Sequence, residues 1–292
     1  MEVTKLGNFG YKITNISFKE DPSQLLQLVG DGRIVVIKNT SPVNPTVLVE
    51  FYKTLGSVVA QADTVAGVGV DGYNELVRVT STSLFAGADD GELEWHSAGM
   101  NRTGSEDIVA MYMNITSDTG GNTYFSDGQS AYNDLGIDIK NSINEIKSKT
   151  LTYKVGEKLG LSSLHKNIFY DTESLMTFKD IDGTPSFEKQ VNRKMLVTTH
   201  PINNKKGLHF PWSVIRGFTG MPKEQQKELY FHLKEHTMQD KYVYTHTWDP
   251  YDIILSDQHH SLHRRDKYYG NRELFRSGIW VHNIHDTATT IN

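Results

Sequence analysis

The sequence contains no cysteine among its 292 residues. This excludes disulfide bonds, thiolate nucleophiles, iron–sulfur clusters and cysteine-type zinc sites. Histidine, aspartate and glutamate remain as the side chains able to hold a metal ion, and the chain has 12 histidines. Any metal site must therefore be built from these three residue types.

Long apolar runs and clustered basic residues are also lacking. No stretch approaches the roughly 20 consecutive apolar residues that a membrane span needs, and the N-terminal segment MEVTKLGNFGYK lacks the regions of a secretory signal. The net charge is -5, and the one candidate basic patch is HRRDKYYGNR, residues 263–272, which we interpret as a solvated loop. We therefore expect a cytoplasmic protein that binds neither membranes nor nucleic acid.

Two helices are predicted in the first third of the chain. One begins after Asp21 with Pro22 and ends at Gly30; the other begins after Asn44 with a proline and ends at Gly56. Proline suits the first helical turn, and glycine suits the residue just past the end. Two further helices are expected later, in SAYNDL (130–135) and PKEQQKELYFHLKEH (222–236).

Short strand-like runs, separated by Gly, Asn and Asp, fill most of the remaining chain. They are ELVRVTS, DIVAMYMNIT, NTYFS, LTYKV, KMLVTTH, KYVYTHTW, DIILSD and LFRSGIWVHN. This pattern predicts a mainly β fold with flanking helices, whose core is a double-stranded β-helix (a cupin-like jelly roll). We expect a single domain over residues 1–292, with the polar, irregular segment 156–190 as an insertion or lid.

Five short motifs follow one another from about Glu94 to the C-terminus. They are WHSA (95–98), GGNT (120–123), HPINNKKG (200–207), DIILSDQHHSLH (252–263), and an arginine 13 residues beyond the last histidine. In this order they resemble the taurine dioxygenase family of Fe(II)/2-oxoglutarate oxygenases. The family pattern is W-H-x-D, then G-G-x-T, then H-P with a later Gly. An aspartate, a hydrophobic run, a second aspartate and a histidine after five more residues follow, and an arginine comes some 10 to 15 residues later. A zincin-like pair of His259 and His263 is a weaker local alternative, because the required glutamate is missing.

The resemblance assigns roles to five side chains. It implies that His96 and His263 are the imidazole ligands of a non-haem iron. It implies that Arg276 forms a bidentate salt bridge with the distal carboxylate of 2-oxoglutarate, for which a planar guanidinium is suited. Thr123 would add a hydroxyl hydrogen bond to this cosubstrate, and Arg272 matches a second arginine of some members. The implied cofactor and cosubstrates are Fe(II), 2-oxoglutarate and O2.

Position 98 departs from the family pattern, because alanine stands where a carboxylate should complete the facial triad. Losing one anionic ligand leaves iron with an open position and one more positive charge, which chloride can fill. WHSAG is similar to the H-x-A form of the non-haem iron halogenases, in which 2-oxoglutarate yields succinate and the substrate radical recombines with chlorine. Backbone amides of Ala98 and Gly99, with Ser97 or Asn101, would help to hold the chloride. We predict chlorination of an unactivated C–H bond.

Three alternatives remain open at this stage. Ala98 could replace a native aspartate, so that the natural reaction is hydroxylation. The chain could be a natural hydroxylase that works with two histidines and water. It could also be a non-catalytic relative that acts as a binding protein. Restored hydroxylation by Ala98→Asp, halide-dependent product, or absent Fe(II) binding would separate these cases.

The substrate is predicted only in outline, because pocket-lining loops vary among proteins. Arg102 is a candidate partner for a substrate carboxylate or phosphate. Candidates for an aromatic wall and an ammonium partner are Tyr124, Asp127, His209 and Trp212, although ordinary packing explains each equally well. A small polar metabolite such as an amino acid or nucleotide, free or tethered to a carrier protein, fits these groups.

Metal-bound imidazoles usually donate their second N–H to an acid, a carbonyl or water. Asp252 and Asp257 lie close enough in sequence to His263 to be candidates for this bond. The sequence contains no signal for the oligomeric state.

Overall fold

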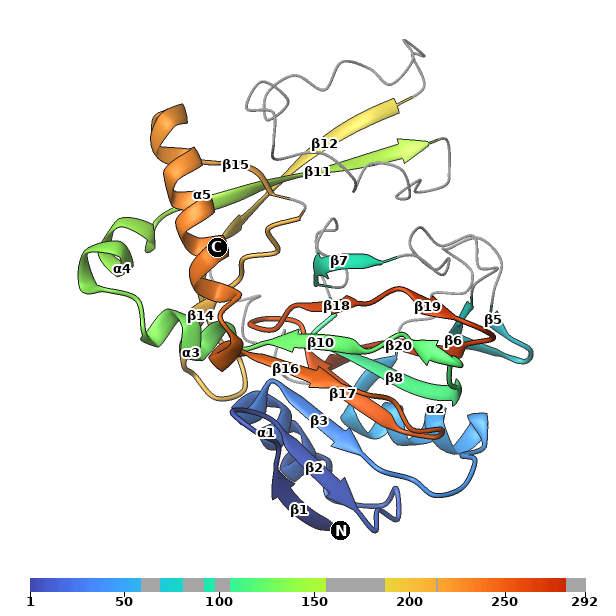
Figure 1. Ribbon diagram of the computed structural model, residues 1–292. Helices are drawn as coiled ribbons and strands as arrows, with labels where there is room; N and C mark the ends of the chain where they lie inside the picture. Colours follow the sequence, from blue (N-terminus) through green and yellow to red (C-terminus); the bar gives the residue numbers. More distant parts are fainter. Residues whose placement is uncertain (59–68, 81–91, 98–105, 156–186, 214, 282–292) are drawn as a thin grey trace.

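The computed structural model describes residues 1–58, 69–80, 92–97, 106–155, 187–213 and 215–281 (Figure 1). The predicted insertion falls mostly on residues 156–186, which lie outside this set, and its last four residues begin strand β12. No helix in the described ranges is both long and apolar enough to cross a bilayer.

The larger sheet has nine strands in the order β1-β2-β3-β17-β8-β20-β6-β5, with β4 beside β20. Only the β2–β3 pair is parallel among its pairings. The bounds are β1 Glu2–Lys5, β2 Tyr11–Thr14, β3 Ile34–Ile37, β4 Gly56–Val58, β5 Gly69–Val70, β6 Tyr73–Thr80, β8 Ile108–Ile115, β17 Ile253–Asp257 and β20 Glu273–Val281.

A four-stranded sheet, ordered β16-β10-β18-β7, faces the larger one (Figure 1), and the other described strands form one three-stranded and two two-stranded sheets. The bounds of its strands are β16 Val243–His246, β10 Thr123–Ser126, β18 His263–Arg265 and β7 Leu93–His96. In the three-stranded sheet, β11 (Lys147–Val155) lies between β12 (Phe187–Met195) and β15 (Ile215–Phe218). The two-stranded sheets are β13 (Val197–Thr199) with β14 (Lys206–Leu208), and β19 (Tyr268–Tyr269) with β9 (Thr119–Gly120).

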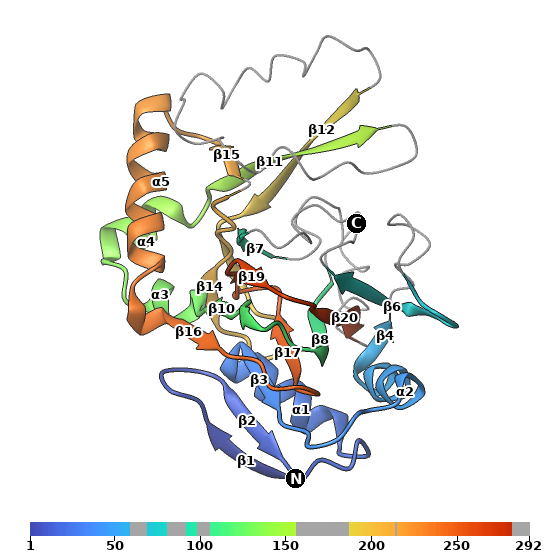
Figure 2. The ribbon, with the colours of Figure 1, turned by 45° about the vertical axis from the view of Figure 1, so that its right-hand side comes forward.

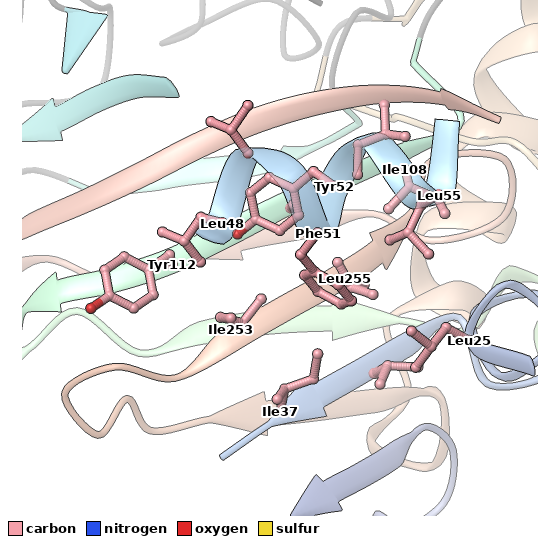
Figure 3. Close-up of a cluster of buried hydrophobic side chains, with 14 of the residues drawn as sticks. Leu25, Ile37, Leu48, Phe51, Tyr52, Leu55, Ile108, Tyr112, Ile253 and Leu255 are labelled. Carbon is pink, nitrogen blue, oxygen red and sulfur yellow. The ribbon is translucent and has the colours of Figure 1, made fainter. Parts of the chain in front are cut away.

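Residue alternation gives the larger sheet two apolar faces. The outer face packs on helices α1 (Pro22–Gly32) and α2 (Pro45–Leu55), as the cluster around Phe51 and Tyr52 shows (Figure 3). The inner face packs against the smaller sheet through a cluster formed by Ile34, Val36, Val109, Met111, Met113, Ile254, Leu274, Phe125 and Trp248. Two sheets enclosing one core confirm the predicted jelly roll.

The remaining helices are α3 Gly128–Asn133, α4 Ile137–Ile143, α5 Lys223–Thr237 and the 3-10 turn η2 Asp240–Tyr242. In Figures 1 and 2 they lie at one end of the sheets, where α5 runs beside β15. They pack with β13, β14 and β15 in a separate core that includes Leu196, Leu208, Phe210 and Leu233.

The helix starts predicted from Asp-Pro and Asn-Pro are confirmed by their caps. The Asp21 carboxylate accepts a hydrogen bond from Ser23 N at 2.9 Å, and the Asn44 amide oxygen accepts one from Thr46 N at 2.8 Å. These bonds satisfy amides that have no partner inside the helix. Helix α1 continues two residues past Gly30 to Gly32, and Arg33, with a φ of 66°, ends it.

Candidate metal centre

His96 and His263 meet although they are far apart in the sequence. His96 ends β7, His263 begins β18, and the two residues are direct partners in the antiparallel ladder. Their ring centroids lie 4.2 Å apart, with an interplanar angle of 53°. We expected His263 just past the end of β17. In the structure, residues 258–262 follow β17, and His263 begins the next strand, β18.

The protonation of these imidazoles suits a metal ion. His96 Nδ1 lies 2.7 Å from the carbonyl oxygen of Glu94, so a proton on Nδ1 is held there and the Nε2 lone pair is left for a metal. Burial, together with the charges of His96 and Arg276, holds the pKa of His263 well below its usual value. The buried His263 Nδ1 has no hydrogen-bond partner within the described ranges. Two imidazoles side by side fit the predicted iron ligands, and metal binding requires each in its neutral form.

Ala98, at the position of the third ligand, lies outside the described residues, as do Gly99, Asn101 and Arg102. Within the described part of the chain, no third histidine, aspartate or glutamate joins the pair in a metal-binding group. Ser97 is described: it is buried, and its hydroxyl has no partner among the residues placed by the structure.

Next to the histidines, the GGNT motif forms a turn that requires its glycines. Gly120 and Gly121 have φ values of 71° and 75°, which L-residues rarely adopt. A Cβ on Gly120 would lie 2.2 Å from the Lys267 carbonyl oxygen. One on Gly121 would lie 3.4 Å from Arg272 Nε, so the turn brings Arg272 against this motif.

Thr123 follows this turn and begins β10, the strand that pairs with the His263 strand β18. It is the ladder partner of Arg265, whereas Phe125 is the partner of His263. Direct partners in an antiparallel ladder project from the same face. Thr123 is buried, and its hydroxyl accepts a hydrogen bond from Trp248 Nε1 at 2.8 Å.

Two arginines of the run 263–272 are buried, which corrects its interpretation as a solvated loop. Arg265 and Arg272 are 5% and 3% exposed, and both guanidinium groups lie against the Tyr268 ring. Burial and the neighbouring charge of Arg265 lower the pKa of Arg272 to about 10. Arg272 forms no ion pair with any carboxylate that the structure describes. Arg265 was not predicted, although its place two residues after His263 puts it on the same strand face.

Arg276 approaches the metal end of the site from the larger sheet. It pairs across the ladder with Met111, which belongs to the inner core. Its Nη2 lies 3.5 Å from Oε1 of the buried Glu106. The charge of Arg276 contributes to the lowered pKa of His263. Sequence analysis did not identify Glu106 as a site residue.

The segment that carries two of the substrate candidates contacts the strand of His96 through Ser213. Ser213 Oγ donates to the Trp95 carbonyl, which connects the segment of His209 and Trp212 to β7. His209 is buried, and burial and the charge of Lys194 keep its pKa well below the usual value. The indole of Trp212 carries the Lys234 ammonium 3.9 Å above its ring.

The other described candidates have partners within the protein. The Tyr124 hydroxyl donates to Asp266 Oδ2 at 2.6 Å, and the Arg264 guanidinium lies 3.7 Å from its ring centroid. The Asp127 carboxylate caps α3 by accepting hydrogen bonds from Gln129 N and Ser130 N. The structure therefore brings Tyr124 to the edge of the site and gives Asp127 the role of capping the start of helix α3.

Asp257 fixes the segment that carries His263. Its carboxylate accepts the amides of His259 and His260, each at 2.9 Å, and forms buried contacts with His200 Nε2 at 3.1 Å and Arg33 Nη1 at 3.3 Å. These contacts bury His200 at the start of a turn that follows β13, whereas Pro201 is exposed.

Asp252, at the other end of β17, pairs with Lys38 and His246. Among the described contacts, neither candidate acid accepts a hydrogen bond from His96 or His263.

Comparison with known proteins agrees with this geometry. The family description "Taurine catabolism dioxygenase TauD, TfdA family" matches residues 2–277. An alpha-ketoglutarate-dependent 2,4-dichlorophenoxyacetate dioxygenase of Burkholderia sp. (strain RASC) is 26% identical over 218 residues, covering 70% of this chain and 67% of the relative. The protein of the same description from Cupriavidus pinatubonensis is 26% identical over 222 residues, covering 70% and 69%.

Solved structures share the fold over almost the whole chain. The structure of a taurine dioxygenase from Burkholderia xenovorans superimposes with a TM-score of 0.73 at 14% identity, covering 96% of this chain and 89% of that chain. AAD-2 in complex with Mn(II) and N-oxalylglycine gives a TM-score of 0.70 at 18% identity, covering 97% and 98%. From the family match over residues 2–277, the chain belongs to the taurine catabolism dioxygenase TauD, TfdA family, for which Fe(II), 2-oxoglutarate and O2 are the expected cofactor and cosubstrates.

Proposed function

We propose that this chain is an Fe(II)/2-oxoglutarate-dependent halogenase that chlorinates an unactivated C–H bond of a small polar metabolite, free or tethered to a carrier protein. The observation that carries the proposal is the alanine two residues after His96, where the facial triad needs a carboxylate. The buried Ser97 hydroxyl, unpartnered among the described residues, adds a donor beside that position. A vacant ligand position with a nearby donor suits an anion such as chloride.

The two histidines would hold the iron, and bound iron with 2-oxoglutarate would supply the oxygen activation that the reaction needs. The structure suggests a different arginine for the cosubstrate from the one that the resemblance implies. Arg272 is buried against the GGNT turn without a described carboxylate, whereas Arg276 contacts Glu106. We assign the distal carboxylate of 2-oxoglutarate to Arg272, with Thr123 as its hydroxyl partner.

The ladder spacing supports this assignment. Thr123 and its partner Arg265 lie two residues along the strands from Phe125 and His263. Two strand residues span roughly 6.6–6.8 Å, which a five-carbon dicarboxylate can bridge. One end of the cosubstrate would then lie at the metal and the other between Thr123 and Arg272. A buried guanidinium holds such a carboxylate in fixed orientation and keeps water from it.

The test is an anaerobic titration of the protein with Fe(II) and 2-oxoglutarate, in which the visible metal-to-ligand charge-transfer band is followed as chloride is added. We expect a band that shifts with saturable chloride dependence. Ala98→Gly should retain the shift, whereas Ala98→Asp should abolish it, because a carboxylate then occupies the position. A wild-type band that ignores chloride would contradict the halogenase and favour hydroxylation.

Hydroxylation is the second candidate, and a specific observation favours it: the curated relatives are named dioxygenases. A protein that forms no band with Fe(II) and 2-oxoglutarate would contradict both reactions and support a non-catalytic binding protein. Mass spectrometry of the product distinguishes the two enzymes, since chlorine and hydroxyl add different masses to the substrate.

A further inference from the structure

Trp248 forms a hydrogen bond with Thr123, the hydroxyl residue of the GGNT motif. Its indole Nε1 donates to the Thr123 hydroxyl at 2.8 Å, and both residues are buried. Thr123 lies in a strand that is paired on both sides, with His246 as its ladder partner on one side and Arg265 on the other. The two ladders fix its backbone, so the direction of its hydroxyl proton is determined by side-chain contacts.

The chemistry of the two groups determines where this proton points. An indole N–H is only a donor, whereas a threonine hydroxyl both donates and accepts. Because Trp248 can only donate, the Thr123 oxygen is the acceptor of this bond and the hydroxyl proton is directed elsewhere. Within the described ranges, the Thr123 hydroxyl donates to no acceptor. A carboxylate, which only accepts, is a suitable partner for such a proton.

The neighbouring arginine cannot take this proton either. A Cβ on Gly121, two residues before Thr123, would lie 3.4 Å from Arg272 Nε, so the buried Arg272 lies against the turn that leads into β10. A guanidinium has five N–H donors and no acceptor. Trp248 and Arg272 are thus both donors only. The proposed function supplies the missing acceptor, because it places the distal carboxylate of 2-oxoglutarate between Thr123 and Arg272.

Packing and the following turn hold the Trp248 indole in place. The centroid of the His246 ring lies 4.7 Å from that of Trp248, with an interplanar angle of 89°, and His246 Nε2 lies 3.1 Å from Asp252 Oδ2. Trp248 also belongs to the inner core, together with Phe125. The Asp252 carboxylate accepts a hydrogen bond from Asp249 N at 3.0 Å, which closes the turn after Trp248. The indole N–H therefore has a fixed direction.

We propose that Trp248 is a positioning residue for the cosubstrate: by donating to Thr123, it directs the Thr123 hydroxyl proton toward the distal carboxylate of 2-oxoglutarate. The proposal rests on the proposed function, which assigns that carboxylate to Thr123 and Arg272. A hydroxyl that accepts one hydrogen bond donates another more strongly, because linked hydrogen bonds polarise one another. Trp248 thus both orients and strengthens the bond from Thr123, and it acts only through that residue.

The experiment measures N-oxalylglycine binding by titration calorimetry on the full chain loaded with Mn(II), the pair seen in the AAD-2 complex. N-oxalylglycine carries the two carboxylates of 2-oxoglutarate. Trp248→Phe keeps an aromatic ring and removes the N–H, and we expect it to weaken N-oxalylglycine binding by about tenfold without changing Mn(II) affinity. Thr123→Val, which removes the hydroxyl at nearly constant volume, should weaken N-oxalylglycine binding by about tenfold or more.

The combined variants separate positioning from support of the fold. In the Thr123→Val background, Trp248→Phe should weaken binding by less than about twofold, because the hydroxyl on which it acts is absent. In the Thr123→Ser background, which retains a hydroxyl, the loss should again be about tenfold. Equal weakening by Trp248→Phe in all three backgrounds, or no weakening in the wild-type background, would overturn the proposal.

Trp280→Phe is the matched control for the change of ring. Trp280 is 41% exposed and lies on β20 of the larger sheet, where its ladder partner is Ser57. This variant should bind N-oxalylglycine as tightly as wild type. A loss as large as that of Trp248→Phe would overturn the proposal, because the effect would then not depend on the bond to Thr123.

A measurement on the unmodified chain remains available if Trp248→Phe does not fold. The chain has four tryptophans, whose indole N–H signals can be observed by NMR in 15N-labelled protein loaded with Zn(II) and assigned by single Trp→Phe substitutions. N-oxalylglycine should shift the Trp248 signal downfield and leave that of Trp280 in place, because a donating hydroxyl is also a stronger acceptor. An unmoved Trp248 signal at saturating N-oxalylglycine would overturn the proposal.

Two further results separate this inference from the proposed function. If wild-type protein and Trp248→Phe bind Mn(II) and N-oxalylglycine equally tightly, the role of Trp248 is overturned and the iron and 2-oxoglutarate assignment stands. Wild-type protein that binds neither Mn(II) nor N-oxalylglycine overturns the proposed function itself, and with it this inference.

Discussion

Arg272 carries a buried charge that no carboxylate among the described residues neutralises, and burying such a charge is costly unless an anion joins it. Replacing it with methionine keeps much of the volume and removes the charge. We expect Arg272→Met to weaken N-oxalylglycine binding by about 10- to 100-fold, because hydrogen bonds to charged groups contribute about 1.5–3 kcal/mol. Calorimetry on the Mn(II)-loaded protein measures this.

The control for this prediction is Arg264→Met, because Arg264 lies over Tyr124 and pairs with Asp266 at the edge of the site. Its affinity for N-oxalylglycine should match that of wild type. If Arg276→Met weakens N-oxalylglycine while Arg272→Met does not, the assignment implied by the resemblance is right and ours is wrong.

Residues that stand in local motifs could be predicted from the sequence, whereas residues placed in the site by strand pairing alone could not. His96 and His263 are recognisable because each lies in a short pattern of fixed spacing, and the structure brings the two together. Glu106 has no such pattern around it. Its position beside Arg276 depends on the pairing of β8 with β20, for which a single sequence contains no direct signal.

At the scale of elements, the segment 258–262 between β17 and β18 is held by Asp257, and this segment leads directly into His263. We expect Asp257→Asn to lower the free energy of unfolding by about 3–5 kcal/mol, since it breaks a buried ion pair. It should also weaken Mn(II) binding by about tenfold or more, because the amides that position the segment lose their strong acceptor. Denaturant unfolding and calorimetry measure the two effects.

Asp252→Asn is the matched control for the second effect. Asp252 is equally buried, at 0% against 1% for Asp257, and lies immediately before the same strand, but it pairs with Lys38 and His246. We expect comparable destabilisation and unchanged Mn(II) affinity. Equal loss of Mn(II) affinity in both variants would mean that stability alone, not the position of His263, determines metal binding.

Helix starts were predictable because the capping information is local. Proline at the first turn and an acid or amide before it suffice, and the structure confirms both. Strands β7 and β18 were not predicted as strands, since four and three residues carry too little alternation to recognise. They form because β18 pairs with both β10 and β7. These pairings join segments that are far apart in the chain, so the local sequence does not predict them.

At the scale of the whole molecule, buried ionisable groups should determine the response to acid. Burial lowers the pKa of His260 from 6.5 to about 3 and holds that of His209 well below 6.5. The Asp257 carboxyl, although burial opposes it, has a pKa held well below 3.8 by the charges of His200 and Arg33. All three groups are therefore less protonated in the folded protein than in the unfolded chain at intermediate pH.

This difference determines the sign of the pH dependence. The unfolded chain binds protons at His260 and His209 as the pH falls through 6.5, while the folded protein does not, so stability falls as the pH is lowered. Each such group contributes a slope of about 1.4 kcal/mol per pH unit between its two pKa values. Asp257 extends the loss to lower pH, because its stabilisation is present above 3.8 and disappears as the pH falls through its folded-state pKa.

We expect His260→Gln to lose stability less steeply than wild type between pH 6.5 and the folded-state pKa of about 3. Glutamine cannot take up a proton, so the slope should fall by about 1.4 kcal/mol per pH unit even though lost contacts with Thr198 and Gln129 lower stability at every pH. Denaturant unfolding across this range, with a chelator present, measures the slope. His232→Gln, on the exposed face of α5, should keep the wild-type slope. Equal slopes in all three proteins would show that His260 is protonated in the folded state, and that its burial between β13 and β17 does not exclude the charge.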